Sequence, residues 1–311
     1  MLNVMNKANH HLWGIDLGGT KIEGVVMESA YGTDCLFRDR VATEANRGYE
    51  HILNQVATLV DSMEAKAGYR AEKIGIGTPG TMDKHTGLFK NCNSTQLNSK
   101  PLQVDLEKKL GMKVITANDA NCFALAETRL GIVKKKFAEA RVVFGVIMGT
   151  GCGGGIVIDN NVISGLHGVA GEWGHNFLDE SGGVCYCGKK GCVENIISGP
   201  ALERFYTEQT GQTLALKEIH ARYREGRDPS AIKTVNRLHE MFGRALSVVV
   251  NILDPDVIVI GGGVGNISTL YDMGIERLKS YVFNDRFDTP VVMPLLGDSA
   301  GVFGAALLVE E

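Results

Sequence analysis

The chain has 311 residues, of which 44% are hydrophobic and 22% are charged, and its net charge is −4 at pH 7. This length and composition favour a soluble enzyme of two domains. The negative charge argues against nucleic acid and anionic membranes as partners, because affinity for both depends largely on excess lysine and arginine. Residues 1–11 contain no apolar run of signal-peptide length, and no later run could span a bilayer, so we expect a cytoplasmic protein.

The first predicted feature is a strand, a glycine turn and a second strand near the amino terminus. Apolar runs predict strands over residues 12–15 and 22–27. The turn between them contains Asp16, Gly18, Gly19, Thr20 and Lys21. Backbone N–H groups of such a turn can hold phosphate oxygens, although an ordinary tight hairpin is the alternative interpretation.

Helices and strands then alternate. Helical apolar spacing predicts a helix over residues 49–67, and a buried strand is predicted over residues 73–77, just before Thr78-Pro79-Gly80. A further strand is expected over residues 113–116, followed by a helix over residues 119–130.

The junction between that strand and that helix carries Asn118 and Asp119. Asp119 can simply cap the helix. A carboxylate in this position can also accept the proton of a sugar hydroxyl as its oxygen attacks a phosphoryl group. The sequence leaves both roles open.

A second strand, glycine turn and strand unit begins the other half of the chain. Strands are predicted over residues 142–148 and 156–158, with a glycine turn over residues 149–155. The Gly149, Gly151 and Gly154 spacing matches a dinucleotide fingerprint, but that fingerprint must open a helix rather than a strand. No Walker phosphate loop occurs. Two matched hairpins indicate two related domains and a phosphate site on both.

Residues 175–192 predict a metal site. Three thiols and one imidazole fall within 18 residues, at His175, Cys185, Cys187 and Cys192. This donor set suits tetrahedral Zn²⁺ with no open position for water, so we expect a structural zinc ion. Buried reduced cysteines or a disulfide are the alternatives, and a cytosolic location favours the metal.

Acidic residues flank this metal segment. Glu172 precedes it and Glu194 follows it, and a loop held rigid by zinc would pre-organise both carboxylates for sugar hydroxyls. Isolated surface glutamates are the alternative. We also expect Trp173 to line the sugar pocket.

The remainder of the chain continues the alternation. Residues 201–250 are predicted to be mostly helical, residues 257–260 form a strand ending in three glycines, and residues 302–309 close the chain as a helix. The pattern as a whole predicts an α/β fold.

The motifs at residues 14–21, 77–80, 117–122, 149–152, 171–175, 185–192, 251–263 and 297–301 together resemble the ROK family of repressors and sugar kinases. The resemblance implies two actin-like, ribonuclease-H-like domains with a cleft between them, formed by residues 1–118 plus 298–311 and by residues 119–297. It also implies ATP, Mg²⁺ and a hexose phosphorylated at its 6-hydroxyl, and a homodimer.

By the same resemblance, Asp119 would be the general base. The hexose would be bound by Gly80, Asn93, Asn118, Asp119, Glu172, His175 and Glu194. ATP would be held by the first turn, by Gly262 and Gly263, and by Gly149, Thr150, Gly151, Gly153, Gly154 and Gly155.

The substrate is predicted from the finer likeness of residues 91–95 and 170–176 to the fructokinase and mannokinase branch. We expect D-fructose, with mannose or glucose as secondary substrates. The alternatives are an N-acetylglucosamine kinase or glucokinase of the same family, and a non-catalytic sugar sensor. The dozen residues before the first strand are too few for the helix-turn-helix domain of a ROK repressor.

Overall fold

The computed structural model describes residues 11–310, so residues 1–10, in which no signal peptide is predicted, lie outside the described residues, as does residue 311. The chain divides into two compact units. Unit 1 contains the described residues up to Ala138, residues 155–170 and those from Leu295 onward; unit 2 contains residues 139–154 and 171–294. The helix that follows residue 118, where we placed a domain boundary, belongs to unit 1 in this division.

Unit 1 is built on a five-stranded mixed sheet in the order β3-β2-β1-β4-β7. The first three strands in the chain pair antiparallel, whereas β4 runs parallel to both β1 and β7. The strands are β1 (Leu12–Leu17), β2 (Lys21–Met27), β3 (Cys35–Ala42), β4 (Lys73–Thr78) and β7 (Lys113–Asn118), with a separate pair β5 (Thr81–Met82) and β6 (Phe89–Lys90). The helices are α1 (Tyr49–Ala67), α2 (Leu102–Leu110), α3 (Asp119–Arg129), α4 (Ile132–Lys136) and α10 (Ala300–Leu307).

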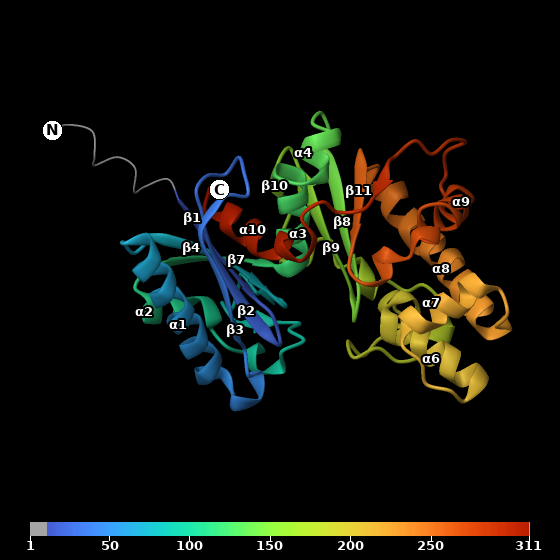
Figure 1. Ribbon diagram of the computed structural model, residues 1–311, viewed down its shortest axis with the longest axis horizontal. Coiled ribbons are helices and arrows are strands. Elements are labelled where there is room, and N and C mark those ends of the chain that lie inside the picture. Colours follow the sequence, from blue (N-terminus) through green and yellow to red (C-terminus); the bar gives the residue numbers. More distant parts are fainter. Residues whose placement is uncertain (1–10, 311) are drawn as a thin grey trace. The chain divides into compact units, whose positions relative to one another are not determined.

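Helices cover both faces of this sheet, with α1 and α2 on one face and α3 and α10 on the other (Figure 1). The prediction of a helix over residues 49–67 is confirmed at both ends. Its apolar residues at helical spacing are buried, and they pack in one cluster with the side chains of Trp13, Ile15 and Leu17 from β1. The main core of unit 1 therefore lies between the sheet and α1.

The opposite face of the sheet is nearly flat, because glycines stand where α10 crosses it. A Cβ atom added at Gly14 would lie 2.4 Å from the backbone nitrogen of Ala306, and one added at Gly75 would lie 1.8 Å from the Ala305 carbonyl oxygen. Side chains alternate along a strand, so Asp16 points to the same face as Gly14. The packing thus places a carboxylate beneath α10.

Unit 2 contains most of a second five-stranded sheet, in the order β10-β9-β8-β11-β12. The strands are β8 (Val142–Met148), β9 (Cys152–Ile158), β10 (Asn161–Val162), β11 (Val257–Gly261) and β12 (Val291–Val292). The division between the units falls within β9, after Gly154. The helices of unit 2 are α5 (Glu194–Ile197), α6 (Gly199–Thr210), α7 (Leu216–Glu225), α8 (Pro229–Leu253) and α9 (Met273–Lys279).

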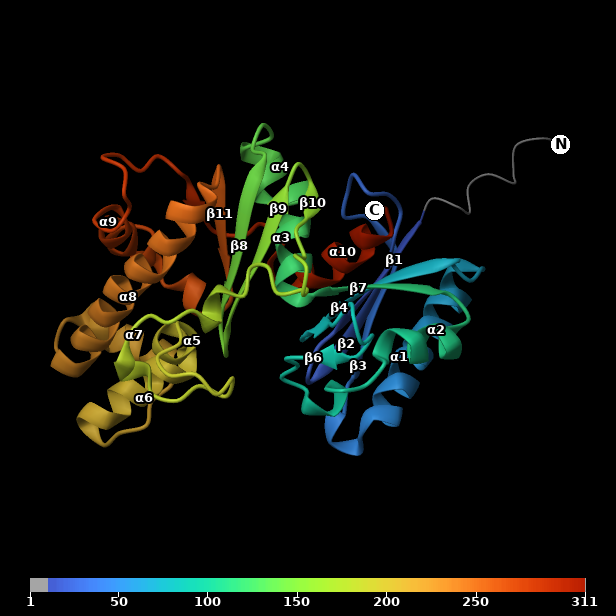
Figure 2. The same cartoon turned by 180° about the vertical axis from the view of Figure 1, so that it is seen from behind.

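The long helix α8 organises the helical part of unit 2. Helices α6, α7 and α9 all pack against it (Figure 2). The predicted helical region over residues 201–250 is confirmed, and it consists of the three helices α6, α7 and α8. Asp228 begins α8 by accepting hydrogen bonds from the backbone nitrogens of Ser230 and Ala231.

The α/β class is confirmed, but the extent of the second glycine turn is corrected. The turn covers only residues 149–151, and the glycines at 153–155 belong to strand β9. Within residues 11–310, no helix has both the length and the apolar character needed to cross a membrane.

Candidate active site

In unit 1, the β1–β2 hairpin carries the first glycine turn. The backbone nitrogen of Gly18 donates to the Lys21 carbonyl oxygen at 3.0 Å, and the Thr43 hydroxyl donates to the Gly18 carbonyl oxygen at 2.7 Å. These bonds fix the base of the turn, while Gly19 and Thr20 are exposed. The tip can therefore meet a ligand without rearranging the hairpin.

Asp16 lies just before this turn and is close to a second carboxylate. Its pKa is raised from 3.8 to about 6, chiefly by burial and then by the negative charges of Asp119 and Glu23. Two neighbouring carboxylates that repel one another are well suited to a divalent cation, which prefers oxygen ligands. The arrangement fits the Mg²⁺ expected with ATP.

Asn118 and Asp119 occupy the junction of β7 and α3. The side-chain oxygen of Asn118 caps the helix by accepting from the backbone nitrogen of Ala120 at 2.8 Å. Asp119 Oδ1 also accepts from that nitrogen, at 2.7 Å. The cap is therefore Asn118, and Asp119 is the first helical residue, held in place by the backbone.

The other two predicted hexose ligands of unit 1 lie around β6. Gly80 packs so closely that an added Cβ would lie 2.5 Å from the Lys90 carbonyl oxygen, and its own carbonyl accepts from the Thr78 hydroxyl. Asn93 is exposed just beyond β6. Both are in the same unit as Asp119, and their contact with a hexose stays a prediction.

In unit 2, the four predicted metal ligands come together. The ligand atoms of His175, Cys185, Cys187 and Cys192 all lie within 4.8 Å of one another. His175 Nδ1 is 3.7 Å from Cys185 Sγ, and the Cys187 and Cys192 sulfurs are 3.6 Å apart. Three thiols and an imidazole that converge in this way fit a structural zinc ion.

The remaining nitrogen of His175 points away from the cluster. His175 Nε2 lies 3.0 Å from the Tyr186 hydroxyl, and the two rings meet edge to face. The imidazole can therefore offer Nδ1 to a metal while Nε2 contacts a hydroxyl. Tyr186 occupies that position here, and a sugar hydroxyl has the same hydrogen-bonding chemistry.

Glu172 lies close enough to Glu194 and His175 to feel the charges of both. Burial raises the pKa of Glu172, the charge of Glu194 raises it further, and His175 lowers it. Glu194 Oε2 accepts a hydrogen bond from the backbone nitrogen of Cys152 at 2.9 Å. The carboxylate thereby connects the metal segment to the first residue of β9.

The expectation that Trp173 lines the sugar pocket is wrong. Its side chain is buried, its ring packs edge to face on Phe144, and its indole nitrogen donates to the Gly153 carbonyl oxygen at 2.9 Å. Trp173 is a core residue that holds the metal segment against β9.

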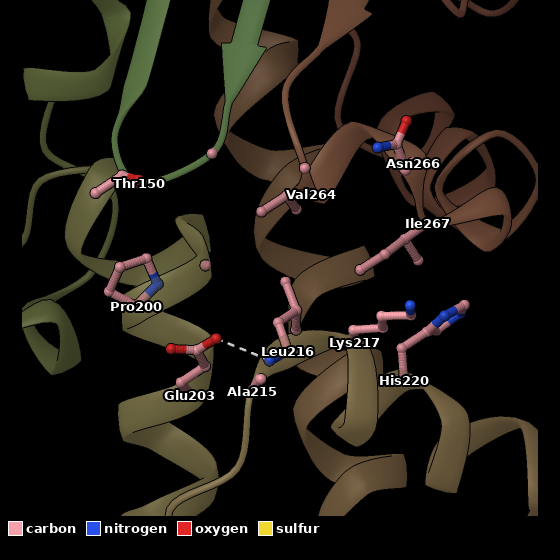
Figure 3. Close-up of a pocket in the computed structure, with 13 residues that line it drawn as sticks. Thr150, Pro200, Glu203, Ala215, Leu216, Lys217, His220, Val264, Asn266 and Ile267 are labelled. Atoms are coloured by element: carbon pink, nitrogen blue, oxygen red, sulfur yellow. Dashed lines mark hydrogen bonds between the residues drawn. The ribbon is translucent and has the colours of Figure 1, made fainter. Parts of the chain in front are cut away.

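The second glycine turn opens onto a pocket of about 750 Å³ within unit 2 (Figure 3). Gly149, Thr150 and Gly263 line one part of it. The turn is fixed by bonds from the backbone nitrogen of Gly149 to the Gly151 carbonyl and from that of Gly199 to the Gly149 carbonyl. The pocket lies in the size range of small-ligand sites.

Much of the pocket wall comes from helices and loops that the sequence analysis did not select. It includes Pro200, Glu203, Ala215, Leu216, Lys217, His220, Val264, Asn266 and Ile267. Glu203 accepts from the backbone nitrogen of Leu216 at 2.8 Å, which joins α6 to the start of α7 (Figure 3). These residues form no motif, so only their arrangement in space reveals them.

Two of the other glycines predicted to hold ATP, Gly154 and Gly262, are closely packed against neighbouring backbone. A Cβ at Gly154 would lie 2.7 Å from the Gly171 carbonyl oxygen, and one at Gly262 would lie 2.2 Å from that of Met148. Gly153 and Gly155 share strand β9 with Gly154. Binding of a nucleotide by these four residues stays a prediction.

Comparison with known proteins places this arrangement in context. The chain is 35% identical over 307 residues to N-acetyl-D-glucosamine kinase of Haemophilus influenzae (strain 86-028NP), covering 95% of this chain and 98% of the relative. It is 36% identical over 307 residues to the N-acetyl-D-glucosamine kinase of Vibrio cholerae serotype O1, with the same coverage. These names do not support the prediction of D-fructose.

Solved structures of ROK sugar kinases also match this chain over nearly its whole length. The ROK hexokinase of Thermus thermophilus matches with a TM-score of 0.84 and 33% identity over 96% of this chain and 97% of that protein. A ROK glucokinase of Streptomyces griseus, in complex with glucose and AMPPNP, matches with a TM-score of 0.77 and 28% identity. The match covers 96% of this chain and 98% of the glucokinase. A model of the ROK family matches residues 12–311, so this chain belongs to the ROK family.

Proposed function

We propose that this protein is an ATP-dependent N-acetylglucosamine kinase that phosphorylates the sugar 6-hydroxyl. The observation that carries the proposal is the full-length similarity to N-acetyl-D-glucosamine kinases, at 34–36% identity for several of them. The closely placed carboxylates of unit 1 and the glycine-turn pocket of unit 2 support phosphoryl transfer. D-fructose is thereby replaced as the expected substrate.

The pocket of unit 2 is the proposed nucleotide site. Gly149, Thr150 and Gly263 would face the phosphates, and the apolar Leu216, Val264 and Ile267 would face the base. A volume of about 750 Å³ is sufficient for a nucleoside triphosphate. In unit 1, Asp16 and the first glycine turn would face the metal-bound phosphates.

Asp119 is the proposed general base. Its carboxylate would accept the proton of the 6-hydroxyl as the oxygen forms a bond to the γ-phosphorus. The bond from that phosphorus to the bridging oxygen breaks, and ADP leaves. Mg²⁺, held near Asp16, would neutralise the developing negative charge. The backbone nitrogen of Ala120 keeps Asp119 oriented.

Hexose ligands are proposed in each unit. Asn118, Gly80 and Asn93 would bind from unit 1, and Glu172, His175 and Glu194 from unit 2. Zinc on the Cys₃His cluster would keep the unit 2 residues in place, since His175 contributes one nitrogen to the cluster and Glu194 follows its last cysteine by two positions.

A coupled assay of ADP release tests the proposal. Purified protein is given ATP and Mg²⁺ with N-acetylglucosamine, glucose, mannose or fructose in turn. We expect the highest kcat/KM with N-acetylglucosamine. A tenfold preference for another hexose would reject the substrate, and the absence of sugar-dependent ADP release would reject the kinase and favour a sugar sensor.

A further inference from the structure

The hydroxyl group of Tyr186 lies among the proposed hexose ligands of unit 2. It is 3.0 Å from His175 Nε2, and the tyrosine and histidine rings meet edge to face with their centroids 5.2 Å apart. The pKa of Tyr186 is raised, first by burial and then by the negative charges of Glu194 and Glu172. The hydroxyl is therefore close to all three side chains that we assign to the hexose in this unit.

A hexose that uses His175 needs the place that this hydroxyl holds. His175 Nδ1 lies 3.7 Å from Cys185 Sγ and belongs to the metal cluster, so Nε2 is the nitrogen left for a sugar. Each imidazole nitrogen offers a single hydrogen-bonding position in the plane of the ring. The Tyr186 hydroxyl and a sugar hydroxyl therefore compete for the same atom.

The Tyr186 side chain can leave this position without disturbing the core. It is 65% exposed, whereas the three hexose ligands are half-buried. Its neighbours Cys185 and Cys187 are both predicted metal ligands, so bound zinc would hold the backbone here while the side chain rotates about its own bonds. Exposed side chains change rotamer within nanoseconds. The exchange thus requires one side chain to move and no change of fold.

We propose that Tyr186 competes with the hexose for His175 and so sets the affinity of the hexose site. In the empty site its hydroxyl is hydrogen-bonded to Nε2, and a hydroxyl of the incoming hexose displaces it. The inference rests on the proposed hexose kinase function. A net hydrogen bond contributes about 0.5–1.5 kcal/mol, which at about 1.4 kcal/mol per factor of ten weakens hexose binding about 2- to 12-fold.

Calorimetric titration of the purified protein with N-acetylglucosamine, without ATP, tests the inference. Tyr186→Phe removes the hydroxyl and keeps the ring, and Tyr186→Ala removes both. Tyr281→Phe is the matched control, because Tyr281 in the same unit also donates its hydroxyl to a side chain, that of Glu240. Elemental analysis checks that the zinc content is unchanged, so that a loosened loop is not mistaken for a lost contact.

We expect the Kd for N-acetylglucosamine to fall about 2- to 12-fold in Tyr186→Phe, at least as far in Tyr186→Ala, and to stay unchanged in Tyr281→Phe. NMR of protein with ¹³C-labelled tyrosine follows the displacement itself. The Tyr186 ring signal, identified by its absence from Tyr186→Phe, should shift when the hexose is added.

An unchanged Kd in both Tyr186 variants would overturn the inference. Weaker binding in Tyr186→Phe would overturn it as well, because Tyr186 would then bind the sugar rather than exclude it. If neither the wild-type protein nor the Tyr186 variants bind N-acetylglucosamine or glucose, the hexose site of the proposed kinase is rejected, which is a different result from either of these.

Discussion

The two glycine hairpins look alike in sequence but differ in what surrounds them. In unit 1, the β1–β2 turn follows a half-buried carboxylate, Asp16, that lies close to Asp119. In unit 2, the β8–β9 turn opens onto a pocket whose walls are largely apolar or helical. The first environment suits a cation and the charged end of a nucleotide, and the second suits its base and phosphates. Similar turns thus serve different chemistry because their neighbours differ.

Asp119→Asn tests whether the carboxylate beside the first hairpin acts as the general base. Losing a general base typically lowers rates by about 10² to 10⁴, so we expect kcat to fall by that factor and the hexose KM to change only a few-fold. Steady-state kinetics measures both. Asp285→Asn, an exposed site in unit 2, is the control. Near-native kcat in a folded Asp119→Asn protein would show that the base lies elsewhere.

Glu194 connects the Cys₃His cluster to the second hairpin by accepting from the backbone nitrogen of Cys152, and Cys187→Ser tests whether the cluster holds zinc and keeps the proposed hexose ligands beside it in place. We expect zinc content to fall well below one ion per chain and the hexose KM to rise about tenfold or more, because structural zinc contributes strongly to local folding. Elemental analysis and kinetics provide the measurements. Cys35→Ser lies outside the cluster and serves as the control. A native protein that purifies without zinc would contradict the assignment.

The glycines of the second hairpin can be separated into two kinds. Gly154→Ala should destabilise the fold by about 1–3 kcal/mol, because its Cβ would lie 2.7 Å from the Gly171 carbonyl oxygen. Gly149→Ala should leave stability nearly unchanged, since the nearest atom to its Cβ is 3.9 Å away, but should raise the KM for ATP. Urea unfolding and kinetics distinguish the two. Equal destabilisation by both would remove the distinction between packing and turn glycines.

A pH dependence of stability is expected from Asp16. Its folded-state pKa is raised to about 6, so its contribution to stability is fully present below pH 3.8 and is lost as the pH rises through 6. Asp16→Asn should therefore stabilise the metal-free protein at pH 8, by at most about 3 kcal/mol at 1.36 kcal/mol per pKa unit, and by less at pH 4.5. Thermal unfolding at the two pH values measures this, with Asp34→Asn as an exposed control. If Asp16→Asn stabilises the protein equally at pH 8 and at pH 4.5, titration of Asp16 is excluded as the cause.

The sequence predicted what depends on local periodicity and on chemical motifs. The helix over residues 49–67 and the strand over residues 142–148 match the structure at both ends, because apolar spacing directly encodes a buried face. The four clustered ligands were also predictable, since few other roles bring three cysteines and a histidine so close together.

The sequence could not predict features that depend on tertiary packing. Trp173 resembled a sugar-binding residue but packs on Phe144, and nothing in its neighbours indicates which face of the segment is buried. Glycines 153–155 looked like part of a turn, yet Gly154 is required by close approach to Gly171. The residues of α6 and α7 that line the large pocket follow no pattern in the sequence.

The most direct test of the proposed chemistry is ³¹P NMR of a reaction that contains the protein, ATP, Mg²⁺ and N-acetylglucosamine. We predict that ATP is consumed as ADP and a single sugar phosphate are formed. The phosphorus of that sugar phosphate should couple to the two protons on carbon 6. A phosphorus coupled to the anomeric proton, or ADP and orthophosphate with no sugar phosphate, would contradict phosphorylation at the 6-hydroxyl.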